Sequence, residues 1–264
     1  MTLPHSERLQ FAIDTAHAAG ECAMQWFQSN TLVTDGKTDG SPVTQADRAA
    51  ETLVRERIAA AYPQDGILGE EFPSIESKSG KTWVIDPIDG TMSFVHGVPL
   101  FGTLLACMDQ DTPTIGVIHM PALKETVAAE IGAGSWWYRN DQPPSPAKVS
   151  DHPSLQGAML LSTSFEYYDN PAHKQAWIRL NDLGAHTRGW SDCYAFLLVA
   201  TGRAEAALEP AMMKLWDIAC VPPIIAEAGG TWTTTESTKD LNHGSMIASN
   251  GRVHKFLTQA LQHS

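Results

Sequence analysis

The sequence has few basic residues relative to acidic ones and no long apolar run. Its 264 residues include 18 Lys and Arg against 30 Asp and Glu, which gives a formal net charge of -12. Binding along a nucleic-acid backbone depends on Lys and Arg that neutralise phosphates, so this balance argues against nucleic acid as the main partner. A small phosphate substrate stays compatible with the charge, because bound divalent cations can reverse the local field.

Cysteines are also scarce, and nothing in their spacing indicates a disulfide framework. Cys22, Cys107, Cys193 and Cys220 include no CxxC pair and no zinc-like spacing. We therefore expect four free thiols, as in a cytoplasmic protein. No segment approaches the roughly 20 apolar residues that cross a bilayer. Residues 1–20 lack a basic-then-apolar signal pattern, so we expect neither export nor a membrane partner.

The periodicity of apolar residues predicts an α/β (α+β) fold in two halves. Helices are expected at residues 6–28 and 44–61, with a polar loop over residues 34–42 between them. A Pro-rich polar stretch at residues 140–150 is expected to join an N-terminal half, residues 1–142, to a C-terminal half, residues 143–264. The first half should contain strands at 83–86, 101–108, 114–120 and 126–131. The second half should contain strands at 158–162, 204–209 and 246–249, and helices at 174–183, 192–201, 215–228 and the C-terminus.

The sequence Asp-Pro-Ile-Asp-Gly-Thr at residues 86–91 carries the clearest chemical signal. Asp86 and Asp89 flank a Pro-Ile step directly after a buried strand. Pro87 restricts the residue before it to extended geometry, so both carboxylates can converge on one point with the Ile88 carbonyl free between them. Carboxylates and a carbonyl are the oxygen ligands that magnesium takes. Taken alone, the motif also fits a strand-ending turn in which Asp acts as a cap.

Residues beside this motif extend the predicted site. Gly90 lets the backbone approach a ligand closely, and a helix beginning near Thr91 would turn its free N–H groups toward an anion. Glu70 lies in a Gly-flanked acidic loop, which also fits a solvated turn. Asp217 begins an apolar helix and Asp47 begins another, where each also fits a helix-start acid.

In order and spacing, these motifs resemble the inositol monophosphatase superfamily, from Lys37 to Asn250. The resemblance rests on Glu70-Glu71, the 86–91 motif, Trp216-Asp217 and the Glu-Ala-Gly-Gly sequence at 227–230. It implies a layered α-β-α-β-α sandwich, a homodimer and two or three Mg²⁺ ions per site. The metal ligands that it implies are Glu70, Asp86, the carbonyl of Ile88, Asp89 and Asp217.

The resemblance also implies catalytic roles. Thr91 and Asp47 orient and deprotonate the attacking water, and Glu70 is counted with them among the catalytic residues. The backbone amides of Gly90 and Thr91 hold phosphate oxygens. The substrate is then a small phosphate monoester, and no organic cofactor is expected.

Three segments most resemble histidinol-phosphate phosphatases within the superfamily: residues 37–47, 99–104 and 190–204. Ser191 and Met92 depart from that group's usual Gly and Lys, and residues 94–97 look more like inositol phosphatases. On the substrate side, Asp192 begins a predicted helix and Glu209 ends a predicted strand. Two acids there suit a cationic alcohol such as histidinol, whereas a neutral polyol needs less negative charge.

Several alternatives stay open at this level. Arg188 could reach the substrate phosphate or form a structural salt bridge. His96 could line the pocket or hold structure. The chain could instead be an inositol monophosphatase or a broad sugar-phosphate phosphatase. A non-catalytic phosphate-binding regulator is a remote third reading, against which the retained pair of Thr91 and Asp47 argues.

Overall fold

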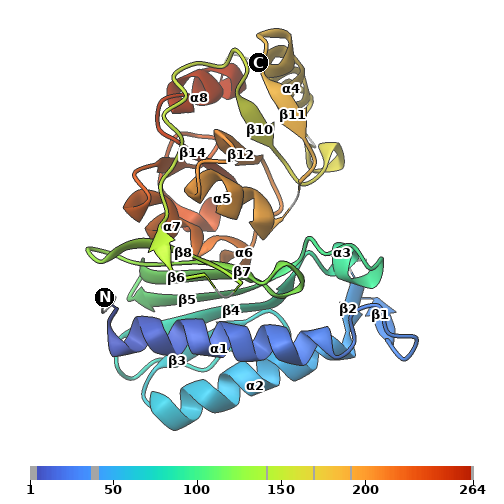
Figure 1. Ribbon diagram of the computed structural model, residues 1–264, viewed down its shortest axis with the longest axis vertical. Coiled ribbons are helices and arrows are strands. Elements are labelled where there is room, and N and C mark those ends of the chain that lie inside the picture. The colour runs from blue at the N-terminus through green and yellow to red at the C-terminus, as the bar shows by residue number, and fades with distance from the viewer. Residues whose placement is uncertain (1–4, 37–41, 141, 169, 191, 263–264) are drawn as a thin grey trace.

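A computed structural model describes residues 5–36, 42–140, 142–168, 170–190 and 192–262, and the structural statements below concern these residues. Helices and sheets alternate in five stacked layers, with α1 and α2 at one end of the stack and α4 and α8 at the other (Figure 1). This arrangement confirms the expected α-β-α-β-α sandwich.

The first layer is a pair of helices, α1 (Glu7–Met24) and α2 (Gln45–Ala61). Ser6 and Thr44 cap them by accepting backbone N–H groups of the first turn. Their apolar faces pack on a seven-stranded sheet, where the side chains of successive strand residues alternate between two buried faces. Trp83, for example, packs toward α1 and α2, and Val84 packs toward the middle layer.

The seven-stranded sheet has the order β3-β4-β5-β6-β7-β8-β9. β3 and β4 are parallel and the other neighbours are antiparallel. Its strands are β3 (Gly66–Gly69), β4 (Lys81–Asp89), β5 (Gly102–Asp109), β6 (Thr112–Met120), β7 (Glu125–Glu130), β8 (Gly134–Arg139) and β9 (Ser145–Pro146).

The second sheet has five strands in the order β11-β10-β12-β14-β13. β10 runs parallel to β11 and β12, so the carboxyl ends of these three strands lie at one edge. The strands are β10 (Met159–Leu161), β11 (His186–Arg188), β12 (Ala206–Glu209), β13 (Thr231–Thr233) and β14 (Met246–Ser249).

Between the sheets lie α5 (Cys193–Ala200), α6 (Leu215–Ile218) and α7 (Val221–Glu227), and beyond the second sheet lie α4 (Pro171–Asp182) and α8 (His254–Gln262). The largest apolar cluster fills the middle layer. The remaining elements are α3 (Thr91–Val95), the pair β1 (Thr34–Gly36) and β2 (Pro42–Thr44), and the 3₁₀ turns η1 (Pro121–Leu123), η2 (Phe165–Tyr167) and η3 (Leu241–His243).

Two predicted elements were wrong. The single helix expected at residues 215–228 is two helices, because Pro222 and Pro223 lack the N–H donors of a helix interior and lie instead in the first turn of α7. The polar loop expected at 34–42 begins with β1, which pairs antiparallel with β2 at residues 42–44, and residues 37–41 lie outside the described residues.

Besides β1, β2 and β9, four strands were not predicted: β3, β8, β11 and β13. Within the predicted joint at residues 140–150, β9 pairs with β8 and extends the first sheet to Pro146. The division into halves at residue 142 stays a prediction.

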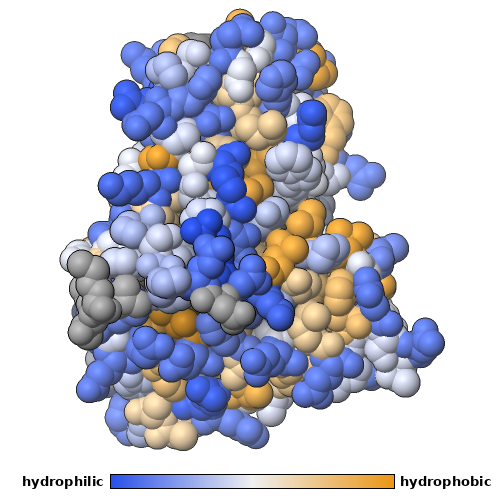
Figure 2. All heavy atoms as spheres, in the orientation of Figure 1, coloured by the Kyte–Doolittle hydropathy of each residue, from blue (hydrophilic) through white to orange (hydrophobic). Residues whose placement is uncertain are grey.

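The outer surface follows from this layering. Figure 2 shows mostly hydrophilic side chains over the outer helices, whose apolar faces point inward. Among the described helices, none is both long and apolar enough to cross a membrane. All four cysteines are free, as expected.

Candidate active site

A β-bulge in β4 brings the first two acids of the site to the same side of the sheet. Residues three apart on a regular strand point to opposite faces. Here Asp86 pairs with Leu104 and Asp89 pairs with Gly102, so three steps on β4 match two steps on β5. The extra residue turns the two carboxylates to one side, which is a common use of bulges next to active sites.

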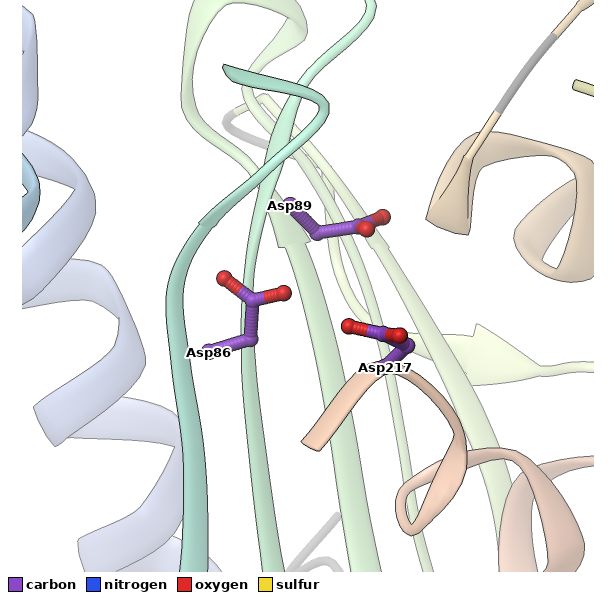
Figure 3. Close-up of side chains that lie close together, drawn as sticks. All are labelled: Asp86, Asp89 and Asp217. Atoms are coloured by element: carbon purple, nitrogen blue, oxygen red, sulfur yellow. The ribbon is translucent and has the colours of Figure 1, made fainter. Parts of the chain in front are cut away.

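Asp217 completes a group of three carboxylates. It lies on α6, in the middle layer, and Figure 3 shows its carboxylate turned toward those of Asp86 and Asp89. One oxygen from each of the three lies within 4.8 Å of the others, and the group can bind a metal ion. Asp217 also accepts the backbone N–H of Lys214 at 2.6 Å, so it caps α6 as well.

The electrostatics of this group favour a bound cation. Burial, and then the charges of Glu70, Asp89 and Asp217, raise the pKa of Asp86 well above its usual range. Burial and the charges of Asp192 and Asp217 do the same to the pKa of Asp89, and burial above all raises the pKa of Asp217 to about 7. Within the described part of the chain, none of the three carboxylates forms an ion pair. A divalent cation would supply the counter-charge.

Glu70 lies next to this group but is not one of the three that converge. It follows β3, which runs parallel to β4, so the sheet brings the acidic loop alongside Asp86. Its charge reaches Asp86 and Asp217 strongly enough to raise their pKa values further. The loop therefore carries a fourth acid to the edge of the cluster.

Asp47 and Thr91 face each other as expected, although the contact is long. The Thr91 hydroxyl lies 3.5 Å from Asp47 Oδ1 and 3.0 Å from the carbonyl oxygen of Ile88. The Ile88 carbonyl therefore accepts one hydrogen bond, from the Thr91 hydroxyl, and keeps its second lone pair for another ligand. Asp47 also accepts both the N–H and the hydroxyl of Thr44, and burial raises its pKa.

Gly90 makes the turn from β4 into α3. Its φ of 86° is a conformation that glycine adopts at little cost, and α3 begins at the next residue, Thr91. An added Cβ would lie 3.0 Å from both Asp192 Oδ2 and the Leu100 carbonyl oxygen. Glycine is therefore required at position 90 both for its backbone conformation and because a side chain there would crowd Asp192 and the Leu100 carbonyl.

The predicted substrate-side acids also lie close to the cluster. Asp192 stands at the start of α5, but its side chain does not cap the helix. The next N–H, that of Cys193, donates to Asp89 at 2.5 Å. Glu209 is 1% exposed at the end of β12, and burial above all raises its pKa to about 8, with the charge of Asp192 adding to the shift.

Arg188 lies on the second sheet, at the end of β11. It is exposed at the end of β11, and its guanidinium donates to the Thr187 carbonyl. It lines a cavity of about 170 Å³ with Ser162, Thr163 and Trp177 among others, and the Thr163 hydroxyl donates to Glu209. The role of Arg188 in binding phosphate stays a prediction. His96 is exposed at the C-terminal end of α3. Its ring nitrogen Nδ1 lies 2.8 Å from the Met92 carbonyl oxygen, at hydrogen-bonding distance.

Sequence reasoning missed Thr163 and Tyr167. The backbone N–H and the hydroxyl of Thr163 both donate to Glu209 Oε1, at 2.7 and 2.9 Å. The pKa of the half-buried Tyr167 is raised by burial and by the charges of Asp192 and Glu209. A polar trio, Ser-Thr-Ser at residues 162–164, begins at the last residue of the predicted strand 158–162, and it is the signal that could have indicated these residues.

Comparison with known proteins identifies the family. The model described as the inositol monophosphatase family matches residues 5–264. The chain belongs to the inositol monophosphatase family. A histidinol-phosphatase from Chlorobaculum parvum is 39% identical over 254 residues, 96% of each chain. An inositol-1-monophosphatase from Synechocystis sp. is 32% identical over 261 residues, covering 96% of this chain and 88% of that relative.

A solved structure supports the same assignment. The extragenic suppressor protein suhB from Bartonella henselae matches with a TM-score of 0.89 at 26% identity, covering 97% of this chain and 99% of that one. As a member of the inositol monophosphatase family, the chain is a phosphoric monoester hydrolase, which confirms the predicted reaction class and the enzyme reading.

Proposed function

We propose that the enzyme hydrolyses L-histidinol phosphate to L-histidinol and phosphate, as a step of histidine biosynthesis. The observation that carries the proposal is the pair of acids, Asp192 at the start of α5 and Glu209 at the end of β12, whose charges reach the three-carboxylate group. The similarity to a histidinol-phosphatase over nearly the full length supports it.

The proposed cofactor is Mg²⁺, with two or three ions per active site. Glu70, Asp86, Asp89 and Asp217 would hold them through carboxylates, and Ile88 through its carbonyl. The donor set fits, because oxygen ligands and several negative charges are what magnesium requires. Bound magnesium lowers the pKa of a water molecule and stabilises charge on the leaving oxygen.

The chain's own groups then orient and deprotonate the attacking water. The Thr91 hydroxyl oxygen would accept a hydrogen bond from the water. The hydroxyl's own proton would turn from the Ile88 carbonyl to Asp47 Oδ1, 3.5 Å away, and pass to that carboxylate as the hydroxyl takes a proton from the water. The raised pKa of Asp47 suits a proton acceptor. The amides of Gly90 and Thr91 would hold phosphate oxygens, and Glu70 would assist the water. Direct attack by water needs no covalent enzyme intermediate.

Specificity would come from the charge of the leaving alcohol. Histidinol carries an ammonium group, and a charge-assisted hydrogen bond to a carboxylate is stronger than a neutral one. A cation beside Glu209 would also favour its ionised form and so lower its pKa. A neutral polyol would bring no positive charge to Asp192 and Glu209.

The test is a comparison of kcat/KM for histidinol phosphate, inositol 1-phosphate and glycerol 2-phosphate, with and without magnesium. We expect histidinol phosphate to be preferred by the wild type. Asp192→Asn should lower kcat/KM for histidinol phosphate at least about tenfold, because losing one partner of a buried charge pair costs about 2–5 kcal/mol. Glycerol 2-phosphate should change little.

An inositol monophosphatase or broad sugar-phosphate phosphatase is the second candidate, favoured by the similarity to an inositol-1-monophosphatase. A wild-type preference for inositol 1-phosphate, or an equal fall for both substrates in Asp192→Asn, would replace the histidinol assignment with this one. A homodimeric state and a cytoplasmic location remain part of the proposal, and sedimentation and cell fractionation would test them.

A further inference from the structure

One face of α2 carries three residues directed at the active site or at the acidic loop. Asp47, Glu51 and Arg55 are four residues apart, so they lie one above the other on the helix. Asp47 reaches Thr91. Glu51 and Arg55 both contact the segment 69–73, which contains Glu70.

Glu51 is a fully buried acid whose carboxylate is shared between the loop and the helix. Its exposed fraction is 0%, its Oε2 accepts the backbone N–H of Glu71 at 2.7 Å, and its Oε1 accepts Nε of Arg55 at 2.7 Å. A Cβ at Gly69 would lie 2.1 Å from Oε1, so the loop closes directly on this carboxylate. Glu51 thus hydrogen-bonds to the backbone after Glu70 and lies against the backbone before it.

Arg55 continues the contact along the same segment. Its Nη2 donates to the Phe72 carbonyl at 2.9 Å and its Nη1 donates to the Pro73 carbonyl at 3.0 Å. The guanidinium therefore joins the Glu51 carboxylate to two carbonyls beyond Glu70. We call the pair Glu51 and Arg55 the α2 clamp.

Such a clamp matters because metal binding tolerates little displacement. Magnesium requires its ligand oxygens at about 2.1 Å in near-octahedral geometry. Asp86 and Asp89 are fixed by the sheet and Asp217 by α6, whereas β3 ends at Gly69 and Glu70 lies beyond it. The position of Glu70 therefore depends on contacts other than the β3–β4 ladder, and the clamp supplies them.

We propose that Glu51 and Arg55 are positioning residues that hold Glu70 at the three-carboxylate group and thereby set the affinity for the metal. The inference rests on the proposed assignment of Glu70 as a metal ligand. Groups that orient metal ligands without touching the ion typically change affinity about 10–100-fold when they are mutated.

The experiment measures Mn²⁺ binding by electron paramagnetic resonance and calorimetry, together with the magnesium concentration that gives half-maximal activity. Glu51→Gln keeps an acceptor for the Glu71 N–H and loses the charge, whereas Arg55→Lys loses the fork on the two carbonyls. We expect each to weaken Mn²⁺ binding at least about tenfold. The half-maximal magnesium concentration should rise by a similar factor, and kcat at saturating magnesium should stay near the wild-type value.

Arg57→Lys is the matched control. It lies on the same helix, but its Nε donates to the Thr15 hydroxyl on α1 at 3.1 Å and not to the acidic loop. It should disturb the packing of α2 on α1 and leave Mn²⁺ affinity unchanged. A loss of affinity in Arg57→Lys equal to that in the clamp variants would overturn the proposal, because any disturbance of α2 would then produce it.

Folding is controlled with a double variant. Removing one partner of a buried ion pair strands the other charge, so Glu51→Gln combined with Arg55→Gln removes both charges and keeps polar groups in place. If this folded double variant binds Mn²⁺ as tightly as the wild type, the clamp has no positioning role. Glu70→Gln separates the two proposals: if it leaves Mn²⁺ affinity unchanged, the ligand assignment of Glu70 is wrong, and the clamp proposal is overturned with it.

Discussion

The backbone N–H of Asp192 donates a 3.0 Å hydrogen bond to the hydroxyl oxygen of Thr163. The same hydroxyl donates to Glu209 Oε1 at 2.9 Å. One side chain therefore links the two acids that we propose to face the leaving group. Because the acids come from different elements, α5 and β12, this hydroxyl fixes their relative position.

Replacing Thr163 with valine removes the hydroxyl and keeps the shape. A hydrogen bond to a charged group contributes about 1.5–3 kcal/mol, and 1.4 kcal/mol is one decade in rate. We expect Thr163→Val to lower kcat/KM for histidinol phosphate about tenfold or more and to spare glycerol 2-phosphate. Thr163→Ser keeps the hydroxyl and should stay close to the wild type. Equal kinetics for the valine and serine variants would contradict the prediction.

The backbone of Asp192 is strained. Its φ of 53° and ψ of -147° lie in a region that glycine reaches readily and that costs other residues about 1–3 kcal/mol. Asp192→Gly should therefore be more stable than Asp192→Ala by about 1 kcal/mol or more, although both lose the carboxylate and the preference for histidinol phosphate. Urea unfolding of the two variants tests this order. If Asp192→Ala is the more stable variant, the backbone at position 192 is not strained.

The three buried carboxylates repel one another, so Asp86→Asn should change the stability of the protein in opposite directions with and without metal. Without metal, Asp86→Asn removes a buried charge that repels Asp89 and Asp217, so it should raise the free energy of unfolding by about 1 kcal/mol or more, or about 2–4 °C in Tm at this length. With magnesium, the wild type gains the binding free energy and the variant does not. Thermal unfolding in EDTA and in magnesium should therefore reverse the order of the two proteins, and activity should be lost in Asp86→Asn.

The Thr91 hydroxyl is predicted to orient the attacking water. Thr91→Ala should lower kcat about 10²-fold or more with a much smaller change in KM, since assistance by a general base is typically worth about 10²–10⁴-fold. Thr91→Ser should retain most of the activity, because it keeps the hydroxyl near Asp47. Quenched turnover analysed by mass spectrometry is the second measurement, and a phosphorylated side chain would rule out direct attack by water.

The acids of the site could be predicted from the sequence because each belongs to a short local motif. Asp86 and Asp89 lie in one hexapeptide, and its proline and glycine indicate the turn. The hydrogen bond from the Thr91 hydroxyl to the Ile88 carbonyl was not predictable in this way. It depends on where the first turn of α3 places the Thr91 hydroxyl.

Residues that act through tertiary contacts were harder to predict. Thr163 contacts residues 29 and 46 positions away, and Glu51 holds a backbone group 20 positions away. No local period encodes such pairings. The strands β3, β11 and β13 are only three or four residues long, so they are shorter than the apolar alternation that identifies a strand.

Because His119 is buried, we expect the free energy of unfolding to decrease in acid. Its ring is 8% exposed, packs against His17 and hydrogen-bonds through Nδ1 to the Thr126 hydroxyl at 2.8 Å. Burial above all, and then the charge of His17, lower the pKa of His119 from 6.5 to about 3. Burial also lowers the pKa of His17, which Asp14 and Glu21 partly offset.

Between pH 6.5 and about 3 the folded state therefore binds fewer protons at His119 than the unfolded state does. The stability due to the neutral ring is complete above pH 6.5 and decreases as the pH falls through this window. At pH 5 the expected loss is about 2 kcal/mol, since one pKa unit is worth about 1.4 kcal/mol. His119→Asn keeps a polar partner for Thr126 but does not titrate. Its free energy of unfolding should fall less than that of the wild type between pH 7 and 5, by about 2 kcal/mol in denaturant titrations, and an equal fall in both proteins would show that the ring is not held neutral.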